Sequence, residues 1–309
     1  MIYTLTLNPA LDKTVVIPRF AVNEVNRISS LRLDAGGKGI NVSKVLVKLG
    51  GTSRATALLG GSTGQMIREM LSQQGIDLDC LEVSGQTRIN LKIIDPEMNT
   101  NTDINEPGVY ITEELTQRLF ERFTKQLCAG DIAVLAGSVP AGIPKDFYAR
   151  CIYACRQAGA KAFLDADGDL FAQAVPAQPY LIKPNREELS RYARRPLNTL
   201  EEVKAVALEL VHGGIEKVVV SLGSQGAMYV SAQVCLYAPA IPVTVGSTVG
   251  AGDSVVAALA LAEERGMSPE DTICLASAVG AANVMCSGTQ AAEQRQVEAL
   301  LPQAVCRPI

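Results

Sequence analysis

Short apolar runs alternate with amphipathic segments along most of the chain. Residues 132–136 and 218–220 are continuously apolar, which is typical of strands buried on both faces of a parallel sheet. Residues 41–49 instead repeat apolar side chains at helical spacing. The alternation predicts an α/β fold with a doubly wound, mostly parallel sheet and helices on both faces.

The pattern predicts the positions of individual elements. The expected strands are 3–7, 55–59, 78–83, 132–136, 161–165, 180–183 and 218–220, with a hairpin at 227–231 and 234–238. The expected helices are 41–49, 64–74, 112–127, 145–158, 199–212, 251–265, 268–286 and 293–301. Two β-rich stretches, about 10–33 and 87–105, do not fit the alternation. We interpret them as insertions that form a small β-sheet lid on a single domain, 1–309.

Charge and composition narrow the classes of function. The 28 basic and 32 acidic residues give a net charge of -4, without the basic excess of a nucleic-acid-binding surface. The chain has one histidine, His212, which is expected at a helix C-terminus, so a histidine-driven reaction is disfavoured. The chain begins directly with a strand pattern and has no long apolar run. We therefore expect a cytoplasmic protein with neither nucleic acid nor membrane as a partner.

The sharpest candidate for chemistry is residues 248–254 (TVGAGDS), which lead straight into an apolar helix. Its glycines let several backbone N–H groups face one point, and the helix N-terminus adds positive potential there. Asp253 at the mouth of such an anion-binding loop suits a general base that takes a proton from an attacking hydroxyl. It suits a helix N-cap equally well, and the spacing alone leaves both interpretations open.

Three other segments also allow a ligand-binding and a structural interpretation. Residues 34–41 (DAGGKGIN) suit either a hydroxylated or phosphorylated ligand or a tight turn. Asn185 and Glu188 suit either a Mg²⁺ site reached through water or a helix capping box. Arg88, in an expected lid strand, is either a phosphate clamp or a solvated edge charge.

Two common nucleotide-binding motifs are missing where they would be expected. Residues 8–12 (NPALD), which follow the first strand, do not contain the glycines of a dinucleotide fingerprint. Lys38 is followed by Gly39, whereas a Walker A loop would have serine or threonine there. The missing fingerprint argues against a dehydrogenase. Residues 221–226 (SLGSQG) follow a buried strand, where open α/β sheets generally bind ligands.

Together these motifs resemble the ribokinase-like pfkB family of carbohydrate kinases, over essentially the whole chain. The motifs that carry the resemblance are 36–41, 183–185 with Glu188, 221–226 and 248–254. Residues 4–12 (TLTLNPALD), 25–27 and 35–42 resemble the sugar-phosphate kinase branch of the family. Residues 87–92 (TRINLK) and 105–108 (NEPG) resemble the 1-phosphofructokinases within that branch.

The resemblance implies a role for each motif residue. Asp253 would be the catalytic base, and the amides around Gly250, Ala251 and Gly252 would hold the transferring phosphoryl group. The residues implied for the sugar phosphate are Asp12, Arg27, Gly37, Lys38, Asn41 and Arg88, with Arg27, Lys38 and Arg88 as a cationic cluster around its phosphate. The residues implied for ATP are Lys183, Asn185, Ser221, Gly223, Gly226, Thr248, Gly252 and Asn283. Glu188 and Asn185 would hold Mg²⁺, through water.

The implied reaction is ATP-dependent phosphorylation of D-fructose 1-phosphate to D-fructose 1,6-bisphosphate. Tagatose 6-phosphate and fructose 6-phosphate are the alternative acceptors. A non-catalytic regulator that binds sugar phosphates is the alternative from another class, since a fold can outlive its reaction. Asp253 beside an intact glycine loop argues against that alternative, because a pure binder needs no base. In this branch the lid often pairs between subunits, so the resemblance also implies a homodimer.

Overall fold

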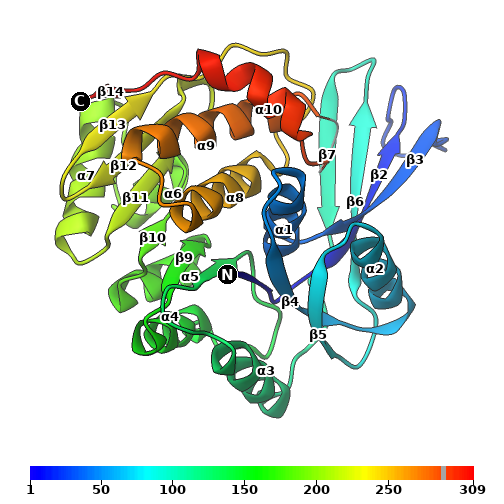
Figure 1. Ribbon diagram of the computed structural model, residues 1–309. Coiled ribbons are helices and arrows are strands. Elements are labelled where there is room, and N and C mark those ends of the chain that lie inside the picture. The colour runs from blue at the N-terminus through cyan, green and yellow to red at the C-terminus, as the bar shows by residue number, and fades with distance from the viewer. Residues whose placement is uncertain (287–289) are drawn as a thin grey trace.

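The computed structural model describes residues 1–286 and 290–309. Its main sheet has ten strands (Figure 1). Their order is β14-β13-β12-β11-β10-β9-β8-β1-β4-β5. Their bounds are β1 Ile2–Thr6, β4 Ser53–Leu59, β5 Asp77–Glu82, β8 Ile132–Ala136, β9 Lys161–Asp165, β10 Leu181–Ile182, β11 Lys217–Ser221, β12 Ala227–Ser231, β13 Cys235–Ala238 and β14 Arg307–Pro308. Strands β5 to β11 in this order pair in parallel, whereas β12, β13 and β14 form an antiparallel edge. The predicted fold class and hairpin are confirmed.

The strand order indicates that a ligand would bind near the carboxyl end of β1. The chain runs outward from β1 through β4 to β5, and then returns to the other side of β1 with β8. In open α/β sheets, ligands bind at the carboxyl ends of the strands where the order reverses in this way. Residues just after β1, β8 and β9 are therefore candidates for the site.

Helices cover both faces of the main sheet, and this explains the continuous apolar strands. Val219 packs in the cluster under α1 (Lys38–Lys48), α8 (Ala251–Glu264) and α9 (Pro269–Val284), whereas Val220 packs in the cluster under the opposite helices. The remaining helices are α2 Gly61–Gln73, α3 Glu113–Lys125, α4 Phe147–Ala158, α5 Gly168–Ala174, α6 Arg186–Tyr192, α7 Leu200–His212 and α10 Gln294–Leu300, with 3-10 turns at Val175–Ala177, Gly223–Gln225 and Leu301–Gln303. No helix in the described part of the chain is long and apolar enough to cross a membrane.

Local capping chemistry sets several helix ends where the sequence predicts them. Glu202 N donates to Thr199 Oγ1 at 3.2 Å and Thr199 N donates to Glu202 Oε2 at 3.0 Å, so α7 begins with the predicted capping box and ends at His212. Helix α1 begins three residues earlier than predicted, at Lys38. Lys38 and Asn41 therefore both lie on its first turn.

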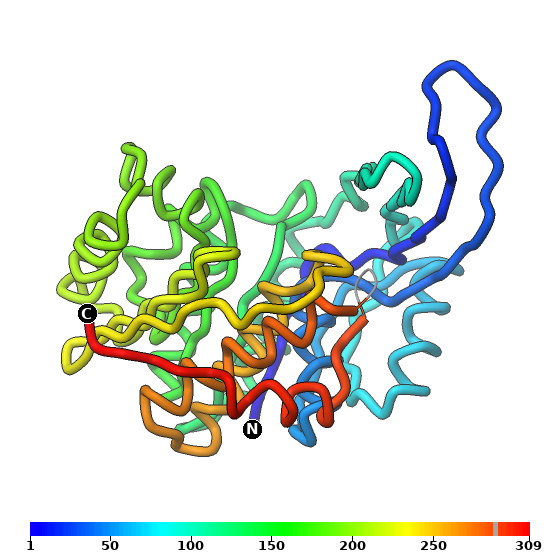
Figure 2. The backbone as a smooth tube through the Cα atoms, turned by 90° about the horizontal axis from the view of Figure 1, so that it is seen from above, coloured from blue at the N-terminus to red at the C-terminus, as the bar shows by residue number. Residues whose placement is uncertain are grey.

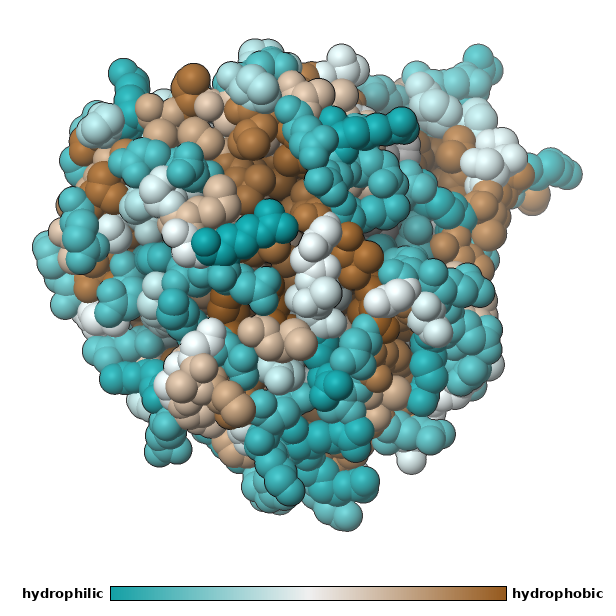
Figure 3. Space-filling view, viewed as in Figure 1, coloured by the Kyte–Doolittle hydropathy of each residue, from teal (hydrophilic) through white to brown (hydrophobic). Residues whose placement is uncertain are grey.

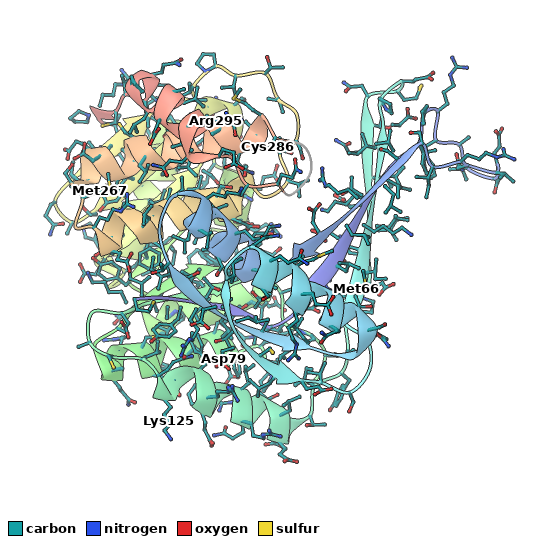
Figure 4. The ribbon with its side chains drawn as sticks, turned by 45° about the vertical axis from the view of Figure 1, so that its right-hand side comes forward. Met66, Asp79, Lys125, Met267, Cys286 and Arg295 are labelled. Atoms are coloured by element: carbon teal, nitrogen blue, oxygen red, sulfur yellow. The ribbon has the colours of Figure 1, made fainter. Side chains whose placement is uncertain are left out.

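The two β-rich stretches form a second sheet of four strands in the order β3-β2-β6-β7. Their bounds are β2 Ala10–Val16, β3 Ser30–Gly36, β6 Arg88–Asp95 and β7 Thr100–Asn105. The β2–β3 hairpin extends well away from the main body (Figure 2). From the side, the small sheet stands apart from the helices, with Met66 of α2 near its base (Figure 4).

The small sheet is amphipathic. Asp12 lies opposite Asp34 on one side and Asn90 on the other, so these polar residues share a face. Val15 lies opposite Leu31 and Ile93 on the other face. Because side chains alternate along each strand, Leu33, Leu91 and Ile104 belong to this second, mainly apolar face as well, which also carries Lys13.

Candidate active site

Helix α8 begins with an anion-binding loop. Gly250 is its N-cap residue and has a φ of 79°, a left-handed conformation that favours glycine. The backbone N–H groups of Gly252 and Asp253 have no acceptor among the described residues, so they remain available to a ligand at the positive end of the helix. Asp253 is the third helical residue, and the N-cap interpretation of its side chain is therefore wrong.

The Asp253 side chain is buried and held by one amide. Its residue is 7% exposed, and Asn41 Nδ2 donates to its Oδ2 at 2.7 Å. Burial, assisted by the negative charge of Asp165, raises the pKa of Asp253 to about 6, against the opposing effects of Lys38, Asn41 and Lys183. A general base works best when its pKa lies near the operating pH. This carboxylate therefore has the properties of a base at neutral pH.

A second buried carboxylate, Asp165, acts electrostatically on Asp253 although it is distant in the sequence. Asp165, at the end of β9, is 2% exposed, and its Oδ1 lies 3.3 Å from Lys38 Nζ and 3.4 Å from Lys183 Nζ. Burial favours the protonated form, but the two lysines outweigh it and hold the pKa of Asp165 below its ordinary value. Against burial, Asp165 in turn raises the pKa of Lys38. The site thus contains two fixed ammonium groups.

Asp12 and the early glycines meet at the base of the small sheet. Asn90 Nδ2 donates to Asp12 Oδ1 at 3.1 Å, and a Cβ added at Gly36 would lie only 2.6 Å from Asp12 Oδ2. Asp12 is 4% exposed, and burial raises its pKa. Gly37 is the N-cap residue of α1, directly before Lys38. The predicted sugar-binding segments therefore lie next to one another, although no hydrogen bond joins the side chains of Asp12 and Asn41.

The structure does not join Arg27, Lys38 and Arg88 by direct contact. Arg88 is half-buried and donates to three backbone oxygens, those of Asn8 at 2.9 Å, Pro9 at 3.4 Å and Glu106 at 2.8 Å. The interpretation of Arg88 as a solvated edge charge is therefore wrong. Arg27 lies exposed in the connection between β2 and β3, within the projecting hairpin (Figure 2).

The Asn185 and Glu188 pair forms the capping box of α6. Glu188 N donates to Asn185 Oδ1, and Asn185 N donates to Glu188 Oε2, both at 2.8 Å. Within the described residues, Glu188 Oε1 makes no hydrogen bond. The structural interpretation is thus confirmed, and one carboxylate oxygen remains for a hydrated Mg²⁺, whose preferred ligands are oxygens.

Two of the residues expected from the sequence to bind ATP, Lys183 and Asn283, lie next to the start of α8. A Cβ added at Gly252 would lie 3.4 Å from Lys183 Nζ, and one at Gly250 would lie 3.6 Å from Asn283 Nδ2. Asn283 is buried on α9. The backbone of Asn185 bridges that of Ser221, which connects the capping box to the loop that contains Gly223 and Gly226. Thr248 is exposed, and its carbonyl oxygen accepts from Ala251 N at 3.4 Å.

Two site residues were missed from the sequence. Asp165 ends a predicted strand, and its position at a carboxyl end near the strand-order reversal was the available signal. Lys44 is 8% exposed on α1, donates to the carbonyl oxygen of Ala35 at 3.0 Å and has its pKa lowered by burial. A lysine in the middle of a helical pattern carried no signal of this kind.

Comparisons with known proteins agree with this architecture. Residues 5–296 match the model of the pfkB family carbohydrate kinases. The 1-phosphofructokinase of Xanthomonas campestris pv. campestris is 40% identical over 263 residues, 84% of this chain and 83% of that protein. That of Bacillus subtilis is 35% identical over 98% of both. Escherichia coli phosphofructokinase-2, solved with substrates and products, has a TM-score of 0.94 at 31% identity, covering 98% of each chain. The chain therefore belongs to the pfkB family of carbohydrate kinases.

Proposed function

We propose that this protein transfers the γ-phosphoryl group of ATP to D-fructose 1-phosphate and forms D-fructose 1,6-bisphosphate. The observation that carries the proposal is the buried Asp253 beside amides at the start of α8 that have no acceptor in the described part of the chain. The carboxylate would take the proton of the attacking hydroxyl, while the amides of Gly252 and Asp253 would stabilise charge on the transferring group. A protein that only binds sugar phosphates would need no such base.

The acceptor would occupy the region between α1 and the small sheet. Asp12, Gly37 and Asn41 would contact its hydroxyl groups. Lys38, whose ammonium group is held by Asp165, would meet the phosphate that the sugar already carries, together with Arg27 and Arg88 once the hairpin closes. The names of the curated relatives, 1-phosphofructokinases of 34–40% identity, support fructose 1-phosphate as that acceptor.

ATP would lie along the nucleotide-side segments. Lys183 would meet its phosphates, and the loop at Ser221, Gly223 and Gly226, with Thr248 and Asn283, would border the nucleotide. Glu188 and Asn185 would hold Mg²⁺ through water, and the ion would neutralise phosphate charge. Glu188 Oε1, which makes no hydrogen bond with the described residues, supports this assignment.

A coupled assay of ADP release tests the acceptor. We expect fructose 1-phosphate to give a higher kcat/KM than fructose 6-phosphate or tagatose 6-phosphate at equal protein and MgATP concentrations. Faster turnover of tagatose 6-phosphate would contradict the choice of acceptor. Absence of ADP release with all three sugars would contradict the kinase proposal itself.

We further propose that the small sheet is a lid on the single domain and that its apolar face pairs with that of a second copy. Leu31 is 50% exposed and Ile104 is 52% exposed on that face. Hydrophobic residues also gather at the right-hand edge of the molecule, over this sheet (Figure 3). Exposed apolar surface on a sheet with two open edges is typical of an interaction site.

Sedimentation velocity tests the pairing. We expect the wild type to sediment as a dimer and Leu31→Asp as a monomer, because an aspartate would place a charge in the apolar interface. Val305→Asp, at a residue that is 59% exposed and outside the small sheet, should remain dimeric. A monomeric wild type at micromolar concentration would contradict the proposal.

A further inference from the structure

Asp165 connects two parts of the site that are far apart in the sequence. It is almost fully buried, and its Oδ1 lies within 3.4 Å of the ammonium groups of both Lys38 and Lys183. Its Oδ2 has no hydrogen-bond partner among the described residues. One carboxylate oxygen of Asp165 therefore forms ion pairs with two lysines that come from different segments of the chain.

The two lysines lie on opposite sides of the expected transfer. Lys38 opens α1 next to the small sheet, where the acceptor would bind, whereas Lys183 follows β10 and lies beside Gly252. We propose that Asp165 is a positioning residue that fixes the spacing between these two ammonium groups and, through them, between the acceptor phosphate and the ATP phosphates. This inference rests on the proposed kinase function and adds to it a residue that aligns both substrates.

Asp165 is itself held rigidly. Its backbone carbonyl oxygen accepts from Gly137 N at 3.0 Å, and the carbonyl oxygen of Gly137 accepts from the hydroxyl of the buried Tyr148 at 3.1 Å. The Cβ of Lys38 lies 3.5 Å from the position a Cβ on Gly137 would take. A fixed anchor of this kind is what an alignment of reacting groups requires, since small misplacements are costly in rate.

The charge of Asp165 also acts on Asp253. The charged side chains that face Asp253 are Lys38 and Lys44 from α1, Asp165 from β9 and Lys183 after β10, while Glu188 of α6 faces Lys38. After burial, Asp165 is the main cause that raises the pKa of Asp253. Removing the charge of Asp165 should therefore lower the pKa of Asp253, because the repulsion is lost while Lys38 and Lys183 still stabilise the Asp253 carboxylate. The same change removes a negative charge that repels anionic ligands, so their binding should not weaken.

The substitution Asp165→Asn separates these effects from a general loss of structure. We expect kcat to fall by about 10²-fold, because the lysines lose their shared anchor. The acid limb of kcat/KM should move to lower pH by about one unit, the effect of one nearby charge. Calorimetry with Mg²⁺-free ADP should give binding as tight as in the wild type or tighter. Asp169→Asn, which removes an exposed carboxylate of α5, should match the wild type in all three.

Several outcomes would overturn the role of Asp165: an acid limb that stays in place, a kcat that is retained, or weaker ADP binding in the Asn variant. If Asp165→Asn does not fold, Asp165→Glu provides the test, since it keeps the charge but moves the oxygen. Its acid limb should stay at the wild-type pH while kcat falls, and a wild-type kcat would overturn the proposal. If the wild-type protein transfers no phosphoryl group, the kinase function is contradicted instead. The comparison of ADP binding by calorimetry between the wild type and Asp165→Asn would still test the role of Asp165.

Discussion

Replacing Asp253 by asparagine should lower kcat by 10²–10⁴-fold, roughly the contribution of a general base. The asparagine has the same shape and its carbonyl oxygen can still accept from Asn41, so both KM values should stay within about threefold of the wild type. A loss confined to kcat identifies an interaction made only in the transition state. Steady-state kinetics with saturating MgATP and fructose 1-phosphate would measure it.

Stability and a matched control separate this loss from unfolding. Burial raises the pKa of Asp253 above that of an exposed carboxyl, so at neutral pH its ionised form opposes folding. The thermal midpoint of Asp253→Asn at pH 7.5 should therefore be no lower than that of the wild type. Asp271 is the corresponding third residue of α9 but is exposed, and Asp271→Asn should retain full activity. Wild-type kcat in Asp253→Asn would contradict its role as the base.

Replacing Gly226 by alanine should distort the loop at residues 223–226, which we propose borders ATP, and should destabilise the fold. Gly226 has a φ of 102°, and an added Cβ would lie 2.0 Å from the carbonyl oxygen of Ala238. Left-handed strain and the backbone clash together should cost roughly 2–5 kcal/mol of unfolding free energy. The loop would have to move, breaking the bond from Leu222 N to Gly226 O, so the KM for ATP should rise at least about tenfold, the effect of one strong hydrogen bond.

Gly223 provides the control within the same loop. Its φ is 60°, but no atom of residues 1–286 or 290–309 lies within 4 Å of an added Cβ. Gly223→Ala should therefore lose only about 1–2 kcal/mol, the cost of the left-handed conformation. Chemical unfolding and ATP titrations would rank the two variants. Equal effects in both, or a larger rise in the KM for the sugar phosphate than in that for ATP, would contradict the assignment of this loop to the nucleotide.

The sequence predicts those parts of the fold in which local pattern and tertiary packing agree. The apolar run at 218–220 indicates a strand buried on both faces, and the structure places Val219 and Val220 in separate clusters. Helix α1 is a partial exception. Gly39 has a low intrinsic helix propensity, yet it lies inside α1, where an added Cβ would meet Thr6 Oγ1 at 2.5 Å. Close packing against β1, which no local pattern shows, explains the earlier helix start.

The same distinction applies to the site. Glycines before a helix are a local signal, so the sequence predicts the loop at Gly250 and the position of Asp253 within it. Asp165 has no such motif, because its importance comes from two lysines that only the folded sheet brings to it. The carbonyl partners of Arg88 are likewise spread over residues 8 to 106. Contacts of this range depend on topology.

The pH dependence of kcat/KM for fructose 1-phosphate tests the central claim most directly, because it measures protonation of the base in the free enzyme. Asp253 must be ionised to accept a proton, and its pKa is raised to about 6 by burial. The wild-type value should therefore be level above about pH 7 and fall about tenfold per unit well below pH 6. The residual activity of Asp253→Asn should lack this limb. A wild-type profile that stays flat down to pH 5, or the same limb in Asp253→Asn, would contradict the account.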